Sequence, residues 1–298
     1  PMPVVMVSSL TEHGADVTLD ALDIGAVDYL PKPKVDLAAT LADYGEELVA
    51  KIRAAAVARL RPPSARSPGT AGSQLSTTIP RYEADAVIAK ALAPRHFRTT
   101  DRIIAVGAST GGTEAIKEVL MALPPDTPGI VVAQHIPKAF STAFARRMNG
   151  CSPMTVCEAE DGQQVLPGHV YIAPGDRHLI LTRDGTRYVC RLDDGLPVNR
   201  HKPSVDVLFR SVAQAAGRNA IGAILTGMGK DGAQGLREML EAGSPTIAQD
   251  EATSVVWGMP GEAVALGGAA HVLPLREIAR KLHQLAGELD ITRQHQAS

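Results

Sequence analysis

Three residues of the types used in nucleophilic catalysis follow three separate apolar stretches of the sequence. Ser109 follows IIAVGA, His135 follows IVVAQ, and Asp231 comes directly after AILTGMGK. A serine hydroxyl is a poor nucleophile unless a base takes its proton, and a histidine base needs a carboxylate to fix its tautomer. In an open α/β sheet, such strand ends meet at one edge. The three residues together therefore predict a serine hydrolase.

Ser109 lies within GASTGG, which matches the pattern G-x-S-x-G. Glycines on both sides allow a sharp turn from strand to helix and place the hydroxyl at a helix N-terminus. Backbone amides and the helix dipole there favour negative charge on an oxyanion. The order Ser109, His135, Asp231 differs from the serine, acid, histidine order of α/β-hydrolases, which excludes that family and leaves the chemistry open.

Each of the three residues also has an ordinary interpretation. A Gly-rich turn after a first strand can bind phosphate, and the pattern alone favours neither use for Ser109, although GASTGG lacks the dinucleotide and P-loop patterns. His135 taken alone is slightly better explained as a capping histidine. Asp231 taken alone fits the N-cap of the next helix. Only their joint occurrence at three strand ends favours catalysis.

Weaker candidates are interpreted as structural or substrate-contacting residues. His201 and Asp206, in HKPSVDVLF, could form a second His/Asp pair, and Asp250 and Glu251 could line the same cleft. The remaining histidines and cysteines lack the spacing of a zinc site, so no metal is expected; those considered are His169, His178, Cys151, Cys157 and Cys190.

Apolar strands alternate with helices through most of the chain. Strands are expected at 103–108, 130–133, 221–225, 246–248 and 271–273, helices at 113–123, 139–148, 204–216 and 231–241, and a hairpin-like insert between 154 and 192. This alternation predicts an α/β fold with a doubly wound, mostly parallel sheet and helices on both faces.

A smaller fragment precedes this domain. Strands at 4–7 and 27–30 and helices at 16–24 and 36–60 form only two βα units. The stretch RPPSARSPGTAGS is typical of a flexible linker, with a short helix expected at 82–92. We therefore divide the chain into a fragment at 1–60, a linker at 61–100, the large domain at 101–287 and a tail at 288–298.

Composition limits the classes of partner. The 298 residues are 45% hydrophobic and 21% charged, with a formal net charge of −2, so neither nucleic acid nor an anionic membrane is expected as a partner. The sequence has no apolar run of membrane-spanning length and no secretory signal at its start. Three cysteines without a CxxC pair favour a reducing cytoplasm.

Five stretches in order closely resemble the catalytic domain of the chemotaxis protein-glutamate methylesterases, over roughly residues 101–285. They are IIAVGASTGGTEAI, VVAQHIPKAFSTAFARRMN, HKPSVDVLFRS, AILTGMGKDGAQGL and QDEATSVVWGMPGEA. The resemblance implies that Ser109 is the nucleophile, His135 the general base, Asp231 the orienting acid, and the Met228 backbone N–H an oxyanion donor. The implied reaction removes γ-methyl esters from glutamates of methyl-accepting chemotaxis receptors, without a cofactor. Deamidation of receptor glutamines, as in some family members, is also implied.

The first segment resembles the second half of a response-regulator receiver domain, which has a flavodoxin-like fold. Ser8, Tyr29 and Lys32 match the switch serine or threonine, the switch aromatic and the phosphate-contacting lysine; Lys32 alone would be interpreted as a surface lysine. A chemotaxis histidine kinase is the phosphodonor for intact family members. Because the half with the phosphoacceptor is missing here, we expect no response to a phosphodonor. We also expect this half-domain to leave the cleft open and the enzyme constitutively active.

Two hypotheses from other classes stay open on the sequence. The chain could be a non-catalytic phosphorelay or receptor-binding module, although the intact set of Ser109, His135 and Asp231 argues against that. It could also bind a nucleotide through GASTGG, in which case nucleotide should raise its melting temperature.

Overall fold

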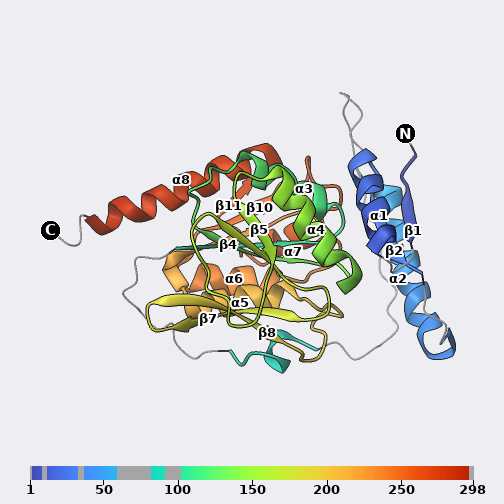
Figure 1. The fold of residues 1–298 in the computed structure, drawn as a ribbon, viewed down its shortest axis with the longest axis horizontal. Helices are drawn as coiled ribbons and strands as arrows, with labels where there is room; N and C mark the ends of the chain where they lie inside the picture. Colours follow the sequence, from blue (N-terminus) through green and yellow to red (C-terminus); the bar gives the residue numbers. More distant parts are fainter. Residues whose placement is uncertain (1, 9–11, 33–36, 59–81, 91–101, 295–298) are drawn as a thin grey trace.

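The computed structural model describes residues 2–8, 12–32, 37–58, 82–90 and 102–294. Its largest element is a seven-stranded sheet in the order β11-β10-β9-β3-β4-β6-β5, in which every neighbouring pair is parallel (Figure 1). The strands are β3 (Ile103–Ala108), β4 (Gly129–Gln134), β5 (Thr155–Glu158), β6 (His169–Ile172), β9 (Ala220–Ile224), β10 (Thr246–Gln249) and β11 (His271–Leu273). The predicted doubly wound α/β sheet is confirmed.

The strand order reverses at the centre of the sheet. The chain enters at β3, proceeds outward through β4 to β6 and β5, and then returns to place β9 on the other side of β3. The carboxyl ends of β3 and β9 therefore border the switch point, where open α/β sheets bind their ligands.

Helices cover both faces of the sheet. One face carries α3 (Gly112–Ala122), α4 (Lys138–Cys151) and α8 (Leu275–Gln294). The other carries α5 (Val205–Ala215), α6 (Ala233–Glu241), α7 (Met259–Ala265) and a hairpin of β7 (His178–Asp184) and β8 (Arg187–Asp193), with the short 3-10 helix η2 (Gly217–Asn219) after α5. Among the described helices, none combines the length and apolar character needed to cross a bilayer.

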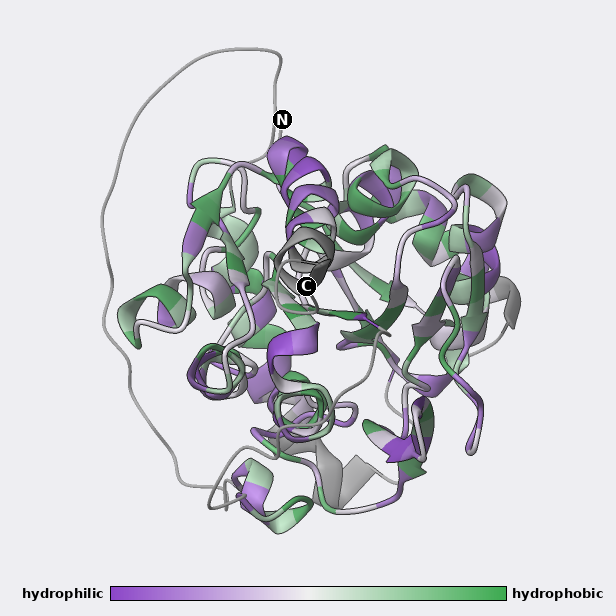
Figure 2. Ribbon diagram, turned by 90° about the vertical axis from the view of Figure 1, so that its left-hand side faces the viewer, coloured by the Kyte–Doolittle hydropathy of each residue, from purple (hydrophilic) through white to green (hydrophobic). Residues whose placement is uncertain are grey.

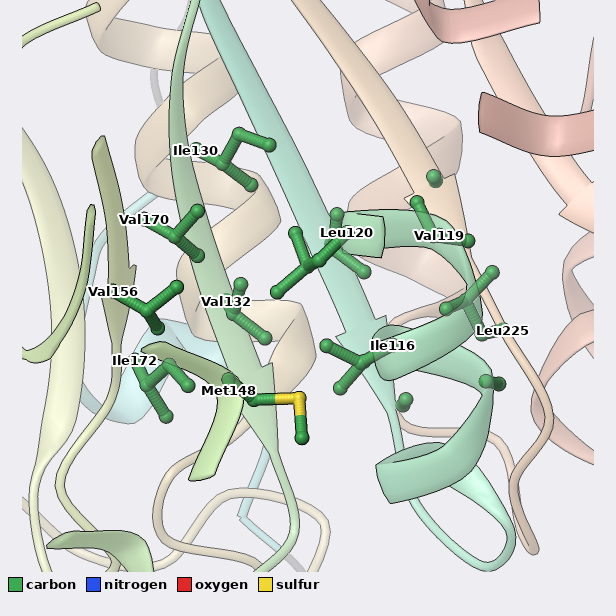
Figure 3. Close-up of a cluster of buried hydrophobic side chains, with 14 of the residues drawn as sticks. Ile116, Val119, Leu120, Ile130, Val132, Met148, Val156, Val170, Ile172 and Leu225 are labelled. Carbon is green, nitrogen blue, oxygen red and sulfur yellow. The ribbon is translucent and has the colours of Figure 1, made fainter. Parts of the chain in front are cut away.

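Successive side chains of the central strands pack into two separate hydrophobic cores, one on each face of the sheet. In β3, Ile104 and Val106 belong to the core on the α3 side, and Ile103 and Ala105 belong to the core on the α5 side. This is the two-residue period of a strand buried on both faces, which explains its unbroken apolar run. Figure 3 shows part of the first core, including Ile116 of α3 and Val132 of β4. Figure 2 shows hydrophobic strands in the middle of the large domain and, around them, helices that carry both hydrophobic and hydrophilic residues.

The N-terminal segment forms a small unit of its own. It contains β1 (Val5–Ser8), α1 (Glu12–Ile24), β2 (Asp28–Pro31) and α2 (Leu37–Val57), and β1 pairs with β2 in parallel. In α1, Leu19 and Leu22 are buried in the same core cluster as α3 and α4. Lys117 and Arg147 form ion pairs with the acidic side of α1, at 3.0 Å to Asp23 and 2.7 Å to Asp20.

The expectation that this segment leaves the cleft is therefore wrong for the structure (Figure 1). The segment docks through α1, because the apolar side of this helix is buried against α4 and its acidic side is paired with Lys117 and Arg147. The sequence analysis considered only how few βα units the fragment contains and overlooked this surface of α1.

Three further expectations change in detail. In the predicted insert, β5 and β6 belong to the main parallel sheet, and only β7 and β8 form a hairpin. Short strands of similar alternating pattern do not reveal their partners. Within the predicted linker, residues 82–90 are described and contain the 3-10 helix η1 (Ala84–Ala86), which packs on α5 through an ion pair between Asp85 and Arg210. The helix α8 extends to Gln294, into the stretch expected as a tail.

Candidate active site

The three candidate residues meet at the carboxyl edge of the sheet. Ser109 follows β3 and His135 follows β4, while Asp231 lies in the loop between β9 and α6. Backbone hydrogen bonds fix the two neighbouring strand ends, with Ser109 N–H donating to Thr226 O at 3.0 Å and His135 N–H donating to Ala108 O at 3.1 Å. The structure thus brings the predicted residues together.

The turn at Ser109 requires its glycines. Gly111 is the N-cap of α3 and has a φ of 74°, in the left-handed region that favours glycine. A Cβ on Gly111 would come within 2.7 Å of Val255, and one on Gly112 within 2.2 Å of the Gln134 amide oxygen. The GASTGG stretch therefore serves a tight strand-to-helix turn that leaves the Ser109 hydroxyl just before the N-terminus of α3.

A continuous hydrogen-bonded chain joins the three side chains. The Nδ1 atom of His135 lies 3.1 Å from the Ser109 hydroxyl, and its Nε2 atom lies 2.8 Å from Oδ2 of Asp231. The carboxylate fixes the proton on Nε2 and leaves the Nδ1 lone pair facing the hydroxyl. In the chymotrypsin arrangement the two ring nitrogens have the opposite partners, but the roles of base and orienting acid are the same.

Asp231 is fully buried and held at the N-terminus of α5. Its carboxylate accepts hydrogen bonds from the Val205 N–H at 2.7 Å, the Ser204 hydroxyl at 2.8 Å and the Asn199 amide at 2.8 Å. Burial by itself would raise the pKa of Asp231, but the hydrogen bond and charge of His135, together with Asn199, hold it below the ordinary value. This carboxylate is thus kept ionised beside the base.

A second buried carboxylate lies next to Asp231. Asp206 accepts a hydrogen bond from the Asn199 amide at 2.7 Å and from the Gly235 N–H at 2.7 Å. Burial and the charge of Asp231 raise the pKa of Asp206 to about 7. Asn199 therefore bridges one ionised and one readily protonated carboxyl group. The expectation that Asp206 is structural fits its contacts, because it touches neither Ser109 nor His135 in any hydrogen bond that the structure records.

Several site residues were not predicted from the sequence. The Gln134 side-chain amide donates to the carbonyl oxygens of Ser109 at 2.9 Å and His135 at 3.2 Å, which links the two strand ends. Ser204 and Asn199 hold Asp231. His201, which the sequence analysis considered only as a partner of Asp206, has its ring stacked on His135. Asn199 and Ser204 do flank His201 in the stretch NRHKPS, but no spacing rule links that stretch to Asp231.

The other sequence candidates lie outside the hydrogen-bonded chain. Asp250 accepts hydrogen bonds from Thr253 in a local turn, and buried His178 contacts the Leu196 carbonyl, which is 3.0 Å from its Nε2 atom. His169 is the first residue of β6, so it lies at the amino ends of the strands, away from the carboxyl edge that carries Ser109. Glu251 is exposed. The three cysteines are free thiols, and within the described ranges no group of three metal-ligating side chains occurs.

The hydrogen-bonded chain opens into a cleft with a volume of about 1450 Å³. Ser109, His135 and Met228 line it from the large domain, and Asp28 and Tyr29 line it from the N-terminal segment. Of the three receiver positions, Tyr29 packs on Phe140 with ring centroids 4.9 Å apart, the Ser8 hydroxyl donates to Gly14 O at 3.1 Å, and Lys32 is exposed. The structure therefore places only Tyr29 at the cleft.

Comparison with known proteins gives one consistent family. Residues 104–282 match the family model described as CheB methylesterase. A protein-glutamate methylesterase/protein-glutamine glutaminase of Xanthomonas campestris is 56% identical over 291 residues, which are 97% of this chain and 78% of that protein. A relative with the same description from Hydrogenovibrio crunogenus is 53% identical over 295 residues, with coverage of 95% and 78%.

A solved structure agrees with these relatives. The crystal structure of the Thermotoga maritima CheB methylesterase catalytic domain matches with a TM-score of 0.61 at 40% identity, covering 63% of this chain and 100% of that one. The solved domain thus corresponds in extent to the large α/β unit described above.

Proposed function

Because this chain belongs to the CheB protein-glutamate methylesterase/protein-glutamine glutaminase family, we propose that Ser109, His135 and Asp231 carry out its ester hydrolysis. The activity is that of the family, which acts in chemotactic adaptation. The observation that supports this assignment of residues is the hydrogen-bonded chain from the Ser109 hydroxyl through His135 to Asp231.

In the first half of the reaction, Ser109 Oγ attacks the γ-carbonyl carbon of a methyl-esterified glutamate. Its proton passes to Nδ1 of His135, which is 3.1 Å away. Collapse of the tetrahedral intermediate breaks the bond to the methoxy group, and His135 returns the proton so that methanol leaves. The product is a glutamyl ester of Ser109.

In the second half, water replaces methanol. His135 takes a proton from the water as its oxygen attacks the ester carbonyl carbon, and the proton then passes to Ser109 Oγ as the acyl bond breaks. The products are a free glutamate side chain and the regenerated enzyme. Asp231 remains ionised throughout and stabilises the imidazolium through the 2.8 Å contact with Nε2.

Negative charge on the carbonyl oxygen is stabilised by backbone amides. The helix α3 begins at Gly112, three residues after Ser109. The first turn of a helix has N–H groups without intrahelical partners and carries the positive end of the helix dipole, both of which favour negative charge. Met228 lines the same cleft as Ser109. We assign its backbone N–H as a second oxyanion donor, as the family resemblance implies.

The same attack on a glutamine side chain would release ammonia in place of methanol, which corresponds to the glutaminase part of the family description. The substrate groups are side chains of methyl-accepting chemotaxis receptors. Since those side chains lie on a long helical bundle in the cytoplasm, an open cleft suits them better than a deep pocket, and we place this protein in the same compartment. A chemotaxis histidine kinase is the expected phosphodonor for family members with an intact receiver domain.

The test is methanol release from methylated receptor in isolated membranes. Ser109→Ala should abolish release while keeping the melting temperature of the wild type, because a small residue on this turn tolerates loss of a hydroxyl. The matched control is Ser152→Ala, a half-buried serine at the C-cap of α4 that does not line the cleft, which should release methanol at the wild-type rate. Wild-type activity in Ser109→Ala would refute the proposal.

A further inference from the structure

The turn that follows Val198 is built in an uncommon backbone conformation. The N–H of Val198 donates to the carbonyl of His201 at 3.0 Å, and the N–H of His201 donates back at 2.8 Å. The two residues between them, Asn199 and Arg200, have φ values of 53° and 72°. Consecutive left-handed residues are typical of a type I′ turn but are uncommon without glycine, and they persist where the surroundings hold them.

Packing and hydrogen bonds hold the first two residues of this turn, Val198 and Asn199, in place. Val198 is fully buried in a cluster with Ala84 and Val207, and the Asn199 N–H donates to Tyr82 O at 2.9 Å. The Asn199 side chain is the bridge to Asp231 already described. The backbone of the turn is therefore held in a defined position beside the site, and so is its last residue, His201.

The ring of His201 stacks on the ring of His135, the proposed catalytic base. The rings of His201 and His135 are nearly parallel, with an interplanar angle of 14° and centroids 3.6 Å apart. The stack is on the cleft side, since both rings line the cleft. This is close contact over the whole ring face rather than a contact at one edge.

The hydrogen bonds of His135 leave one motion free, and the stack opposes it. Its contacts to Ser109 and Asp231 are made at the two ring nitrogens, in the plane of the ring. A hydrogen bond tolerates a modest departure from linearity, so these two contacts only weakly resist a small tilt of the ring out of its plane by rotation about the Cβ–Cγ bond. A tilt would misdirect the Nδ1 lone pair away from the serine hydroxyl. A parallel ring at contact distance on one face blocks the tilt toward that side.

We propose that His201 is a positioning residue, whose ring holds the imidazole of His135 in the plane that joins Ser109 to Asp231. The inference rests on the proposed function, because it requires His135 to be the base. This positioning role differs from substrate binding, in which the half-buried His201 would contact the receptor directly. It also differs from hydrogen bonding by the imidazole, since the proposed contact uses only the ring face.

Three substitutions separate these roles in the methanol-release assay. His201→Ala removes the ring, His201→Phe keeps an aromatic face without nitrogen atoms, and His201→Gln keeps a polar side chain without a ring. Because small misplacements of a catalytic group cost up to about 100-fold, we expect His201→Ala and His201→Gln to lower kcat by about 10-fold or more. We expect His201→Phe to keep kcat within about 3-fold of the wild type, since it retains the stacked contact. KM should change little in all three.

The matched control is His169→Ala. It removes a histidine that stacks on Tyr171 at the amino end of β6, away from the cleft, and should leave kcat unchanged. Melting temperatures show which variants fold. If His201→Ala does not fold, the comparison of His201→Phe with His201→Gln still decides. Wild-type kcat in His201→Ala or His201→Gln, a rise in KM alone, or rescue by glutamine and not by phenylalanine would overturn the proposal. Ser109→Ala in the same assay tests the proposed function separately, since it removes the nucleophile and leaves the stack intact.

Discussion

The carboxylate of Asp28 accepts a hydrogen bond from the hydroxyl of Thr110 at 2.5 Å, and so ties the N-terminal segment to the residue that follows Ser109. Lys51 holds the other oxygen of this carboxylate at 2.9 Å. Asp28 and Thr110 both line the cleft. We therefore expect the docked segment to restrict the approach of a large substrate to the Ser109 hydroxyl.

Removal of this segment should increase the rate. A chain that begins at Tyr82 keeps η1 and the large domain, and we expect it to hydrolyse receptor methyl esters about 3- to 10-fold faster, because a larger fraction of its molecules has an accessible cleft. Asp28→Ala should produce a smaller increase in the full chain. Asp161→Ala, which removes an exposed ion pair with Arg191 inside the large domain, is the control. Equal initial rates for the two chain lengths would show that the docked segment does not restrict the cleft.

The choice of Asp231 as the orienting acid is tested by comparison with its neighbours. Asp231→Asn should lower kcat by about 10⁴-fold, because the amide cannot stabilise the imidazolium or fix the tautomer in the same way. Asp250→Asn should remain close to the wild type, since Asp250 is hydrogen-bonded within its own turn. Steady-state kinetics on methylated receptor gives both values. Full activity in Asp231→Asn with loss in Asp250→Asn or Asp206→Asn would identify a different acid.

Asp206 makes stability depend on pH. Its pKa is raised to about 7 in the fold, whereas an aspartate in an unfolded chain titrates near ~3.9. The folded protein binds this proton more tightly, so the stabilisation is complete below about pH 4 and is lost as the pH rises through about 7. Asp206→Asn cannot lose a proton, so its free energy of unfolding should increase relative to the wild type between these pH values. Urea unfolding at several pH values measures the difference, and a difference independent of pH would contradict the assignment.

Two glycines of the large domain should respond in opposite directions to alanine. Gly111→Ala forces a side chain into a left-handed position against Val255, and we expect a loss of about 1–3 kcal/mol in stability. Gly150 lies in α4 with nothing within 4 Å of a Cβ, so Gly150→Ala should gain about 0.5 kcal/mol from helix propensity. Melting temperatures decide this, and a stable, active Gly111→Ala protein would mean that the turn at Ser109 does not need its left-handed residue.

The sequence was sufficient to predict the sheet and the three residues at its edge. Long apolar strands such as β3 carry a clear signal because both of their faces are buried, and parallel strand ends must meet at one edge. The positions of Ser109, His135 and Asp231 follow from those two facts.

The supporting contacts could not be predicted in the same way. Asn199 and His201 act from a turn whose conformation depends on packing against Val207 and Tyr82, and no periodicity records such a contact. The docking of α1 depends on the shape and charge of a surface on α4 that lies more than a hundred residues away in the chain. A linker composition shows that a segment can move, but it does not show where the segment binds.

The most direct test of the account is capture of the covalent intermediate. A synthetic receptor peptide with a γ-methyl glutamate is mixed with the enzyme, quenched in acid within the first turnover and analysed by mass spectrometry. We predict that the enzyme gains the mass of the peptide less one methanol, on the proteolytic fragment that contains Ser109, and that Ser109→Ala gains none. An adduct on another residue, or continued methanol release by Ser109→Ala, would contradict the mechanism.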